Sequence, residues 1–153
     1  LEKSLEYDAK LIIARAAFKD GDLFTAEEFY TEIERNATGE LKAEALYYSA
    51  FFKNQQKDYQ ASNKVVQKLI ADYSAYKYWA VRSYIIMGKN YYGLKDVYQA
   101  TFVLENIIKN FKQYEDLVAE AEKELNIIKT NEAKTNNSVS PVEEKTTDKK
   151  NKN

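Results

Sequence analysis

Neither cysteine nor histidine occurs in the 153 residues of this chain. Without cysteine the chain can form neither disulfides nor a thiolate metal site, and its redox compartment stays undetermined. Without histidine it lacks the commonest general base and the commonest metal ligand, and no Ser-His or Cys-His pair is possible. These absences leave carboxylate chemistry as the main route to catalysis.

Carboxylates crowd two segments that we expect to be helical: Glu27, Glu28, Glu32 and Glu34 in the first, and Glu120, Glu122 and Glu124 in the second. A carboxylate pair can act as acid and base. Charge-rich helices are also ordinary on protein surfaces, and we interpret both groups as solvated helix faces. We therefore expect a non-catalytic protein that uses no cofactor and no metal ion.

Long apolar runs are also missing. No run approaches the roughly 20 apolar residues that a membrane-spanning helix requires, and no signal peptide is visible at Leu1. The net charge is only −1, and no basic stripe interleaves with aromatic residues as a nucleic-acid-binding face would need. We expect neither a direct membrane span nor a nucleic-acid partner.

Glycine is scarce, with four in the chain, and Gly88 and Gly93 stand five residues apart just before Lys95. A phosphate-binding loop needs G-x-x-x-x-G-K-[ST], so that the lysine directly follows the second glycine. Here Lys95 comes one place late, and the register that pairs Gly88 with Lys89 puts a serine where the first glycine belongs. The stretch is better interpreted as the turn of a helical hairpin.

The pattern around this turn recurs twice elsewhere in the chain. Counted from Asp22, Asp58 and Asp96, a small residue lies eight places before, an apolar one directly after, a small one four after, and large apolar ones eight and eleven after. The aspartates lie 36 and 38 residues apart. The matching sets are Ala14, Leu23, Ala26, Tyr30 and Ile33; Ala50, Tyr59, Ser62, Val66 and Leu69; and Gly88, Val97, Ala100, Leu104 and Ile107. Such self-similarity indicates a repeat array.

Each element of the repeat suits a hairpin of two antiparallel helices. The aspartate suits the start of the second helix, because its carboxylate accepts a hydrogen bond from an unpaired N–H of the first turn. The small residues suit the closest approach of the two helices, since a larger side chain at Gly88 or Ala100 would push the axes apart. One hairpin alone leaves an apolar face exposed to water, so several must stack.

These residues resemble the tetratricopeptide repeat (TPR) family, whose unit is a helix-turn-helix of about 34 residues with a Leu-Gly-x-x-Tyr start and an Ala-x-x-x-Phe middle. The best matches are Met87-Gly88, Tyr91, Ala100 and Leu104 in the third copy, and Ala26 and Tyr30 in the first. The closing proline of the family is absent, and the units are two to four residues longer. The resemblance covers roughly residues 5 to 112. In its general residue pattern the sequence looks most similar to bacterial cell-envelope members of the family, of the Tol-Pal coordinator and outer-membrane assembly lipoprotein types.

The resemblance implies an all-α fold, a right-handed superhelical α-solenoid of about three hairpins with a C-terminal capping helix. We expect helices near 3–19, 22–36, 40–56, 58–73, 76–93, 96–112 and 115–129. The repeat domain would then cover 1–129, with units 3–36, 40–73 and 76–112 and the cap helix 115–129. All 21 aromatic residues lie between Tyr7 and Tyr114, so we expect residues 130–153 to be a disordered polar tail.

In this family the first helix of each pair lines a concave groove, which implies a scaffold or adaptor that binds a protein or peptide partner there. The residues of these helices that do not face the core are the candidates: Arg15, Phe18, Tyr47, Phe51, Asn54, Arg82, Lys89 and Tyr92. Aromatic residues with a few cations are typical of interface hot spots, but the same aromatics could simply pack between helices. The family's polar clamp for a C-terminal carboxylate is not reproduced, because Leu11, Tyr48 and Ile86 occupy three of its places.

Two alternatives stay open, a structural spacer or self-association module and a membrane-associated role. The chain could be a structural spacer or a self-association module of a cell-envelope assembly, for which the apolar side of the first helix is suggestive: Leu5, Ala9, Ile12, Ile13 and Ala16. Because Leu1 falls directly in a helical pattern, we also expect the C-terminal part of a longer repeat protein. A periplasmic or outer-membrane-associated location is the favoured interpretation, with the cytoplasm as the alternative.

Overall fold

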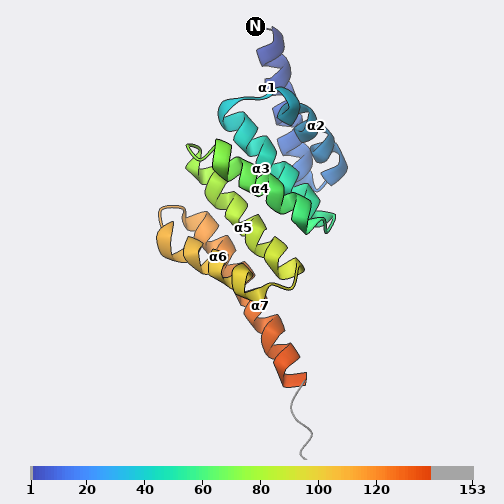
Figure 1. The fold of residues 1–153 in the computed structure, drawn as a ribbon. Helices are drawn as coiled ribbons and strands as arrows, with labels where there is room; N and C mark the ends of the chain where they lie inside the picture. The colour runs from blue at the N-terminus through green and yellow to red at the C-terminus, as the bar shows by residue number, and fades with distance from the viewer. Residues whose placement is uncertain (1, 139–153) are drawn as a thin grey trace, which may run out of the picture.

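Seven helices make up the part of the chain that the computed structural model describes, residues 2–138, and no strand occurs within that range (Figure 1). They are α1 (Glu2–Asp20), α2 (Leu23–Asn36), α3 (Gly39–Gln55), α4 (Tyr59–Asp72), α5 (Lys77–Gly93), α6 (Val97–Asn110) and α7 (Glu115–Ser138). The all-α prediction is confirmed. Apart from the end of α7, every predicted helix boundary lies within two residues of the observed one.

The same turn joins the two helices of each hairpin. Gly21, Lys57 and Lys95 all adopt a left-handed backbone, with φ of 81°, 62° and 68°. The N–H of the following aspartate donates to the carbonyl five residues earlier at 2.9 Å in all three turns. Glycine suits this conformation, and the two lysines carry its strain in the second and third copies.

The three aspartates cap the second helix of each hairpin, as the sequence predicts. The Oδ1 atoms of Asp22, Asp58 and Asp96 accept hydrogen bonds from the third following backbone N–H at 3.1, 3.2 and 3.0 Å. Each bond satisfies one of the donors that a helix start leaves unpaired. The repeat therefore has a common local cause in all three copies.

The small residues of the repeat lie where the paired helices meet. Ala14, Ala50 and Ala100 are 0% exposed, and a Cβ added at Gly88 would come within 2.9 Å of Leu104 Cγ. The prediction that these positions allow close helix approach is confirmed.

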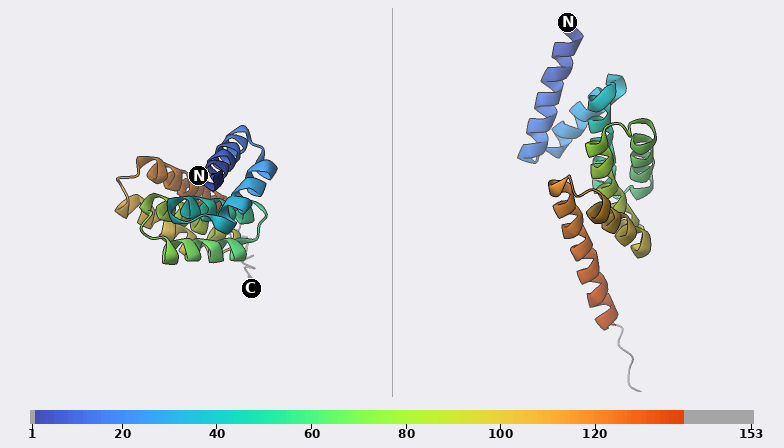
Figure 2. Two further views of the ribbon diagram at one scale, coloured as in Figure 1. Left: turned by 90° about the horizontal axis from the view of Figure 1, so that it is seen from above. Right: turned by 90° about the vertical axis from the view of Figure 1, so that its left-hand side faces the viewer.

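Each helix packs against the next one along the chain, and α3–α5 and α5–α7 are further pairs. Seen from the side, α1 and α7 lie on one side of the molecule and α4 on the other, with α3 and α5 between them (Figure 2). Two buried clusters form the core, and α5 contributes to both through Ala80, Ile86 and Met87 on one side and Val81 and Ile85 on the other. This arrangement is repeat-like and entirely helical.

The last helix differs from the prediction. α7 runs to Ser138 instead of ending at Lys129, so residues 130–138 of the predicted disordered tail are helical. They contain no proline or glycine that would end a helix, and Glu132 accepts a hydrogen bond from the Tyr92 hydroxyl at 3.1 Å. The rest of the predicted tail, 139–153, lies outside the described residues.

Candidate partner-binding face

The predicted groove residues lie on α1, α3 and α5, and most of them already contact another part of the chain. Arg15 of α1 forms a bidentate ion pair with Glu44 of α3, with Nε–Oε1 and Nη2–Oε2 distances of 2.9 and 2.6 Å. Glu44 is only 3% exposed and also accepts a hydrogen bond from the Tyr30 hydroxyl at 3.0 Å. Arg15 therefore neutralises a buried carboxylate and joins the first two hairpins.

Burial and the Glu44 carboxylate both raise the pKa of the Tyr30 hydroxyl. The pKa of Tyr30 lies well above its ordinary value, chiefly because burial penalises the phenolate and then because nearby Tyr48 and Glu44 oppose a negative charge. Tyr30 thus remains a hydrogen-bond donor to Glu44. The hydrogen bonds that Arg15 donates to Glu44 raise the pKa of Arg15, so the guanidinium stays charged.

Phe18 and Phe51 are packing residues between α1 and α3. Phe18 contacts Tyr48 and Phe51 edge to face, with ring centroids 4.8 and 5.1 Å apart. The backbones of α1 and α3 do not approach each other closely, so these long side chains bridge the space between them. The alternative interpretation of helix-to-helix packing describes these two aromatics better than an open hot spot does.

Asn54 belongs to a buried polar network that sequence reasoning missed. Its amide donates to Asn90 Oδ1 at 2.8 Å, and the Asn90 amide donates to Ser62 Oγ and Asn63 Oδ1 at 2.8 and 2.9 Å. Ser62 in turn donates to the Ala50 carbonyl at 2.7 Å. Since every member has a partner, the network sets the register of α3, α4 and α5. The available signal was a polar residue, Asn90, one helical turn after the apolar pair Ile86 and Met87.

Lys89 and Tyr92 connect α5 to α7. The Lys89 Nζ lies 3.6 Å from Glu124 Oε1, and the Tyr92 hydroxyl donates to Glu132. Burial, followed by the hydrogen bond to Glu132, raises the pKa of Tyr92. A pocket of about 190 Å³ remains beside them, bordered also by Tyr59 and Ile127.

Arg82 is the predicted groove residue whose polar atoms are least satisfied. Its guanidinium carbon lies 4.5, 5.6 and 6.0 Å from the ring centroids of Tyr47, Trp79 and Tyr48. Its Nε is buried without a hydrogen-bond partner, and no carboxylate of residues 2–138 forms an ion pair with it. We call these four residues the Arg82 cluster: Tyr47, Tyr48, Trp79 and Arg82.

The electrostatics of the Arg82 cluster favour an anion. Tyr47 is 3% exposed, and its burial raises its pKa although the Arg82 cation opposes that shift. Tyr47 is therefore neutral near pH 7 and does not compensate the cation. Rings within about 6 Å of a guanidinium stabilise it through their π faces, and the Tyr47 side chain and the charge of Glu120 also act on Arg82, but its Nε has no hydrogen-bond partner.

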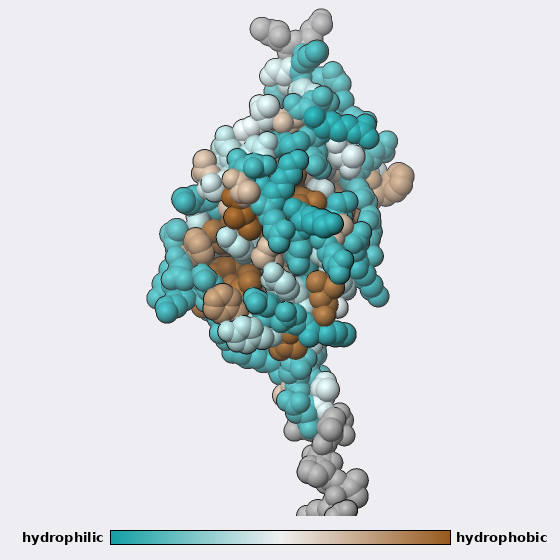
Figure 3. Space-filling view, in the orientation of Figure 1, coloured by the Kyte–Doolittle hydropathy of each residue, from teal (hydrophilic) through white to brown (hydrophobic). Residues whose placement is uncertain are grey.

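A second surface, on α6, was not predicted. Tyr98 and Phe102 are 74% and 54% exposed and stack at a centroid distance of 6.3 Å. Beside Phe102 lies an apolar pocket of about 170 Å³ that Tyr84 and Phe111 help to line. Apolar side chains gather on the face that carries α6 (Figure 3). The signal in the sequence was two aromatics four residues apart on the polar side of a helix.

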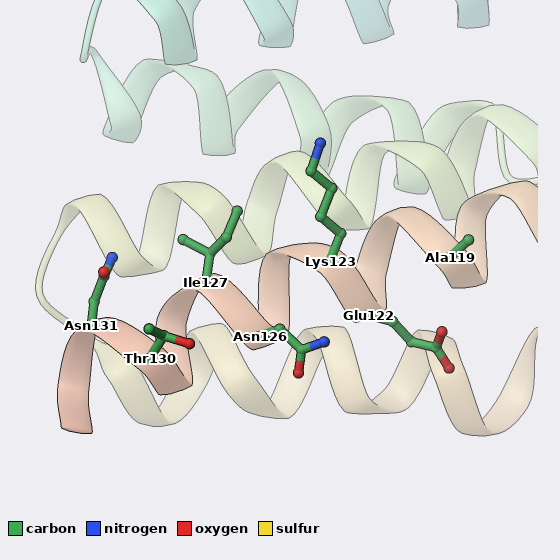
Figure 4. A pocket seen from close by; sticks show the side chains of 7 residues that line it. All are labelled: Ala119, Glu122, Lys123, Asn126, Ile127, Thr130 and Asn131. Carbon is green, nitrogen blue, oxygen red and sulfur yellow. The ribbon is translucent and has the colours of Figure 1, made fainter. Parts of the chain in front are cut away.

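A larger and shallower pocket of about 550 Å³ runs along one face of α7 (Figure 4). It is lined by residues of that helix alone: Ala119, Glu122, Lys123, Asn126, Ile127, Thr130 and Asn131. Among the described residues no group of three or more acidic side chains could hold a metal ion. None of the helices within residues 2–138 is long and apolar enough to cross a bilayer.

No family model matches this sequence, and no curated protein shows significant similarity to it.

Proposed function

We propose that this chain is a non-catalytic scaffold of TPR type, arranged as a superhelical solenoid of three hairpins and a cap, that binds a protein or peptide partner. Support comes from the three hairpins, which share one turn geometry, one capping aspartate and a period of 36 to 38 residues. Arrays of this kind offer extended surfaces for partners. The partner site is the face formed by α3 and α5 around the Arg82 cluster.

The unsatisfied Arg82 carries this proposal. The rings and the charge of Glu120 stabilise the partly buried cation, but its Nε has lost its hydration without gaining a hydrogen-bond partner. An acidic side chain or a C-terminal carboxylate of a partner would form a direct ion pair with the guanidinium and accept hydrogen bonds from it. Trp79 and the tyrosines beside it are residue types that often dominate binding energy. The partner that fits is therefore a segment with a carboxylate next to an apolar side chain.

Partner capture with matched arginine variants tests this function. The immobilised wild-type chain, Arg82→Gln and Arg35→Gln would each be exposed to an extract of cells that produce the protein, and bound proteins would be quantified by mass spectrometry. We expect a set of proteins that Arg82→Gln loses and Arg35→Gln keeps, since Arg35 lies on α2 outside the cluster. Equal capture by all three chains, with unchanged melting temperatures, would exclude the Arg82 cluster as the site.

A direct titration supplements the capture experiment. Trp79 is the only tryptophan of the chain, so its fluorescence reports on the cluster. The probe is a short peptide without tryptophan whose C-terminal residues are apolar residues and glutamate. It should change the Trp79 fluorescence in the wild type and in Arg35→Gln, but not in Arg82→Gln. The same peptide with glutamine in place of glutamate and an amidated end is the control for charge.

A further inference from the structure

The first helix carries an exposed apolar surface that we call the α1 face: Leu5, Ala9, Ile12, Ile13 and Ala16. Leu5, Ile12 and Ile13 are 64%, 69% and 42% exposed, and both alanines are exposed as well. Single exposed apolar residues are normal, whereas a contiguous stripe of them marks an interaction site. The question is which occupant this stripe fits.

The occupant can be inferred by comparing α1 with the equivalent positions of the second and third hairpins. Ile12 stands ten residues before its capping aspartate, as do Tyr48 and Ile86, which are only 7% and 1% exposed. Ala16 stands six before, as do Phe52 and Asn90 at 4% and 0%. In the second and third hairpins these positions are buried, and there the first helix packs against the second helix of the preceding hairpin, α3 against α2 and α5 against α4.

Individual contacts show how the covering helix sits. Tyr48 stacks on Tyr30 of α2 with centroids 4.0 Å apart and an interplanar angle of 15°. The Asn90 amide donates hydrogen bonds to Ser62 and Asn63 of α4. On α1 the same positions face no helix among the described residues.

A charged position adds a second, independent argument. Asp8 stands fourteen residues before its capping aspartate, where the second hairpin has Glu44. Glu44 is held by Arg15 from the first helix of the preceding hairpin and by Tyr30 from its second helix. Asp8 is exposed, and within residues 2–138 its side chain has no hydrogen-bond or ion-pair partner. An occupant that supplies an arginine and a tyrosine hydroxyl at these places would complete the same arrangement.

The opposite end of the stack differs in polarity. One exposed face of α7 bears Glu122, Lys123 and Asn126, with Lys123 and Ile127 pointing one way and Glu122 and Asn126 the other (Figure 4). A helix packed there would bury charges without partners. The α7 end is thus suited to water, as a terminal cap is, while the α1 end is suited to another helix.

We propose that the α1 face is a docking surface for one further hairpin of this repeat type, stacked ahead of α1, whose second helix lies on α1 as α2 lies on α3. That helix carries a small residue followed at four and seven places by large apolar residues, as Ala26, Tyr30 and Ile33 do. A second copy of this chain does not offer such a helix, because α2, α4 and α6 are already covered by α3, α5 and α7. The proposal is independent of the Arg82 cluster.

An extended chain tests the docking surface with a defined occupant. A copy of residues 3–39 is placed directly before Ser4, so that the duplicated α2 precedes the original α1 with the linker that joins α2 to α3. We expect one cooperative unfolding transition, a melting temperature higher by about 4 °C or more, and amide exchange in the original α1 slowed about tenfold or more.

The matched control carries Ile12→Lys and Ala16→Lys in the original α1, in both the extended and the unextended chain. These substitutions should leave the unextended chain nearly unchanged, since both side chains are exposed, and should abolish the gain in the extended chain. An added hairpin that unfolds separately, with exchange in α1 unchanged, overturns the proposal. So does sedimentation of the unextended chain as a dimer that Ile12→Lys dissociates, because a second copy would then be the occupant.

Discussion

Replacing Gly88 by alanine should destabilise the protein, although alanine is the better helix former. The new Cβ would lie 2.9 Å from Leu104 Cγ and 3.0 Å from its Cδ2, whereas carbon atoms in contact stand about 3.5–4.0 Å apart. Leu104 is 0% exposed. The Ala100 carbonyl oxygen is another neighbour of the new Cβ, at 3.5 Å. The leucine therefore cannot move aside without disturbing the α5–α6 packing.

The expected magnitude follows from two opposing effects. Alanine gains about 1 kcal/mol over glycine in a helix interior, and overpacking costs about 1–3 kcal/mol, so the free energy of unfolding should fall by about 1 kcal/mol. The second hairpin suggests a rescue, since it has Ala50 and Val66 at the equivalent positions, both 0% exposed. Leu104→Val alone should lower the free energy of unfolding by about 1 kcal/mol, because the smaller side chain leaves a cavity.

In the Leu104→Val background the same Gly88→Ala change should be stabilising, because the methyl group fills the space that the shorter side chain leaves. Urea unfolding of the four proteins, followed by circular dichroism at 25 °C, gives the coupling between the two sites, which we expect to be about 2 kcal/mol. The slopes with urea should stay equal. If Gly88→Ala has the same effect with leucine and with valine at position 104, the close approach of α5 and α6 is not what selects glycine.

Three further predictions concern the turn, the buried ion pair and the tyrosines. Lys95→Gly should raise the free energy of unfolding by about 1 kcal/mol, because lysine holds φ at 68° there; an unchanged urea midpoint would contradict this. Arg15→Gln should cost about 2–3 kcal/mol and more than Glu44→Gln, since only the former leaves a buried carboxylate without its cation; equal losses in urea unfolding would refute the asymmetry. Burial raises the pKa of Tyr30 and Tyr47 above the ordinary value, so the folded state binds their protons more tightly than the unfolded state. The contribution of these two tyrosines to stability should therefore be fully present below a pH of about 10 and decline above it, and a flat stability profile from about pH 9 to 11 would be inconsistent with this burial.

The helices and turns were predictable because their causes are local. An aspartate caps a helix through an N–H three residues away, and a small residue recurs because paired helices must approach at that point. These signals repeat at Asp22, Asp58 and Asp96, and the structure places all three at helix starts. The end of α7 lacked such a signal. The absence of aromatics after Tyr114 was interpreted as disorder, but it does not stop a helix whose residues favour one.

The fate of the candidate groove residues was not predictable, since their partners are distant in sequence. Arg15 and Glu44 are 29 residues apart, and Asn54 and Asn90 are 36 apart. Whether such residues face a partner or each other depends on the distance and angle between helices, which no local pattern specifies.

The sequence by itself thus determined the all-helical class, the three hairpins and their turns, because each follows from contacts within a few residues. Only the tertiary structure decided which polar groups remain unsatisfied. It pairs Arg15 with Glu44, leaves Arg82 over aromatic rings and exposes the apolar side of α1. The reason is physical: satisfaction of a charge and burial of a side chain depend on neighbours that only the packing of separate helices brings together.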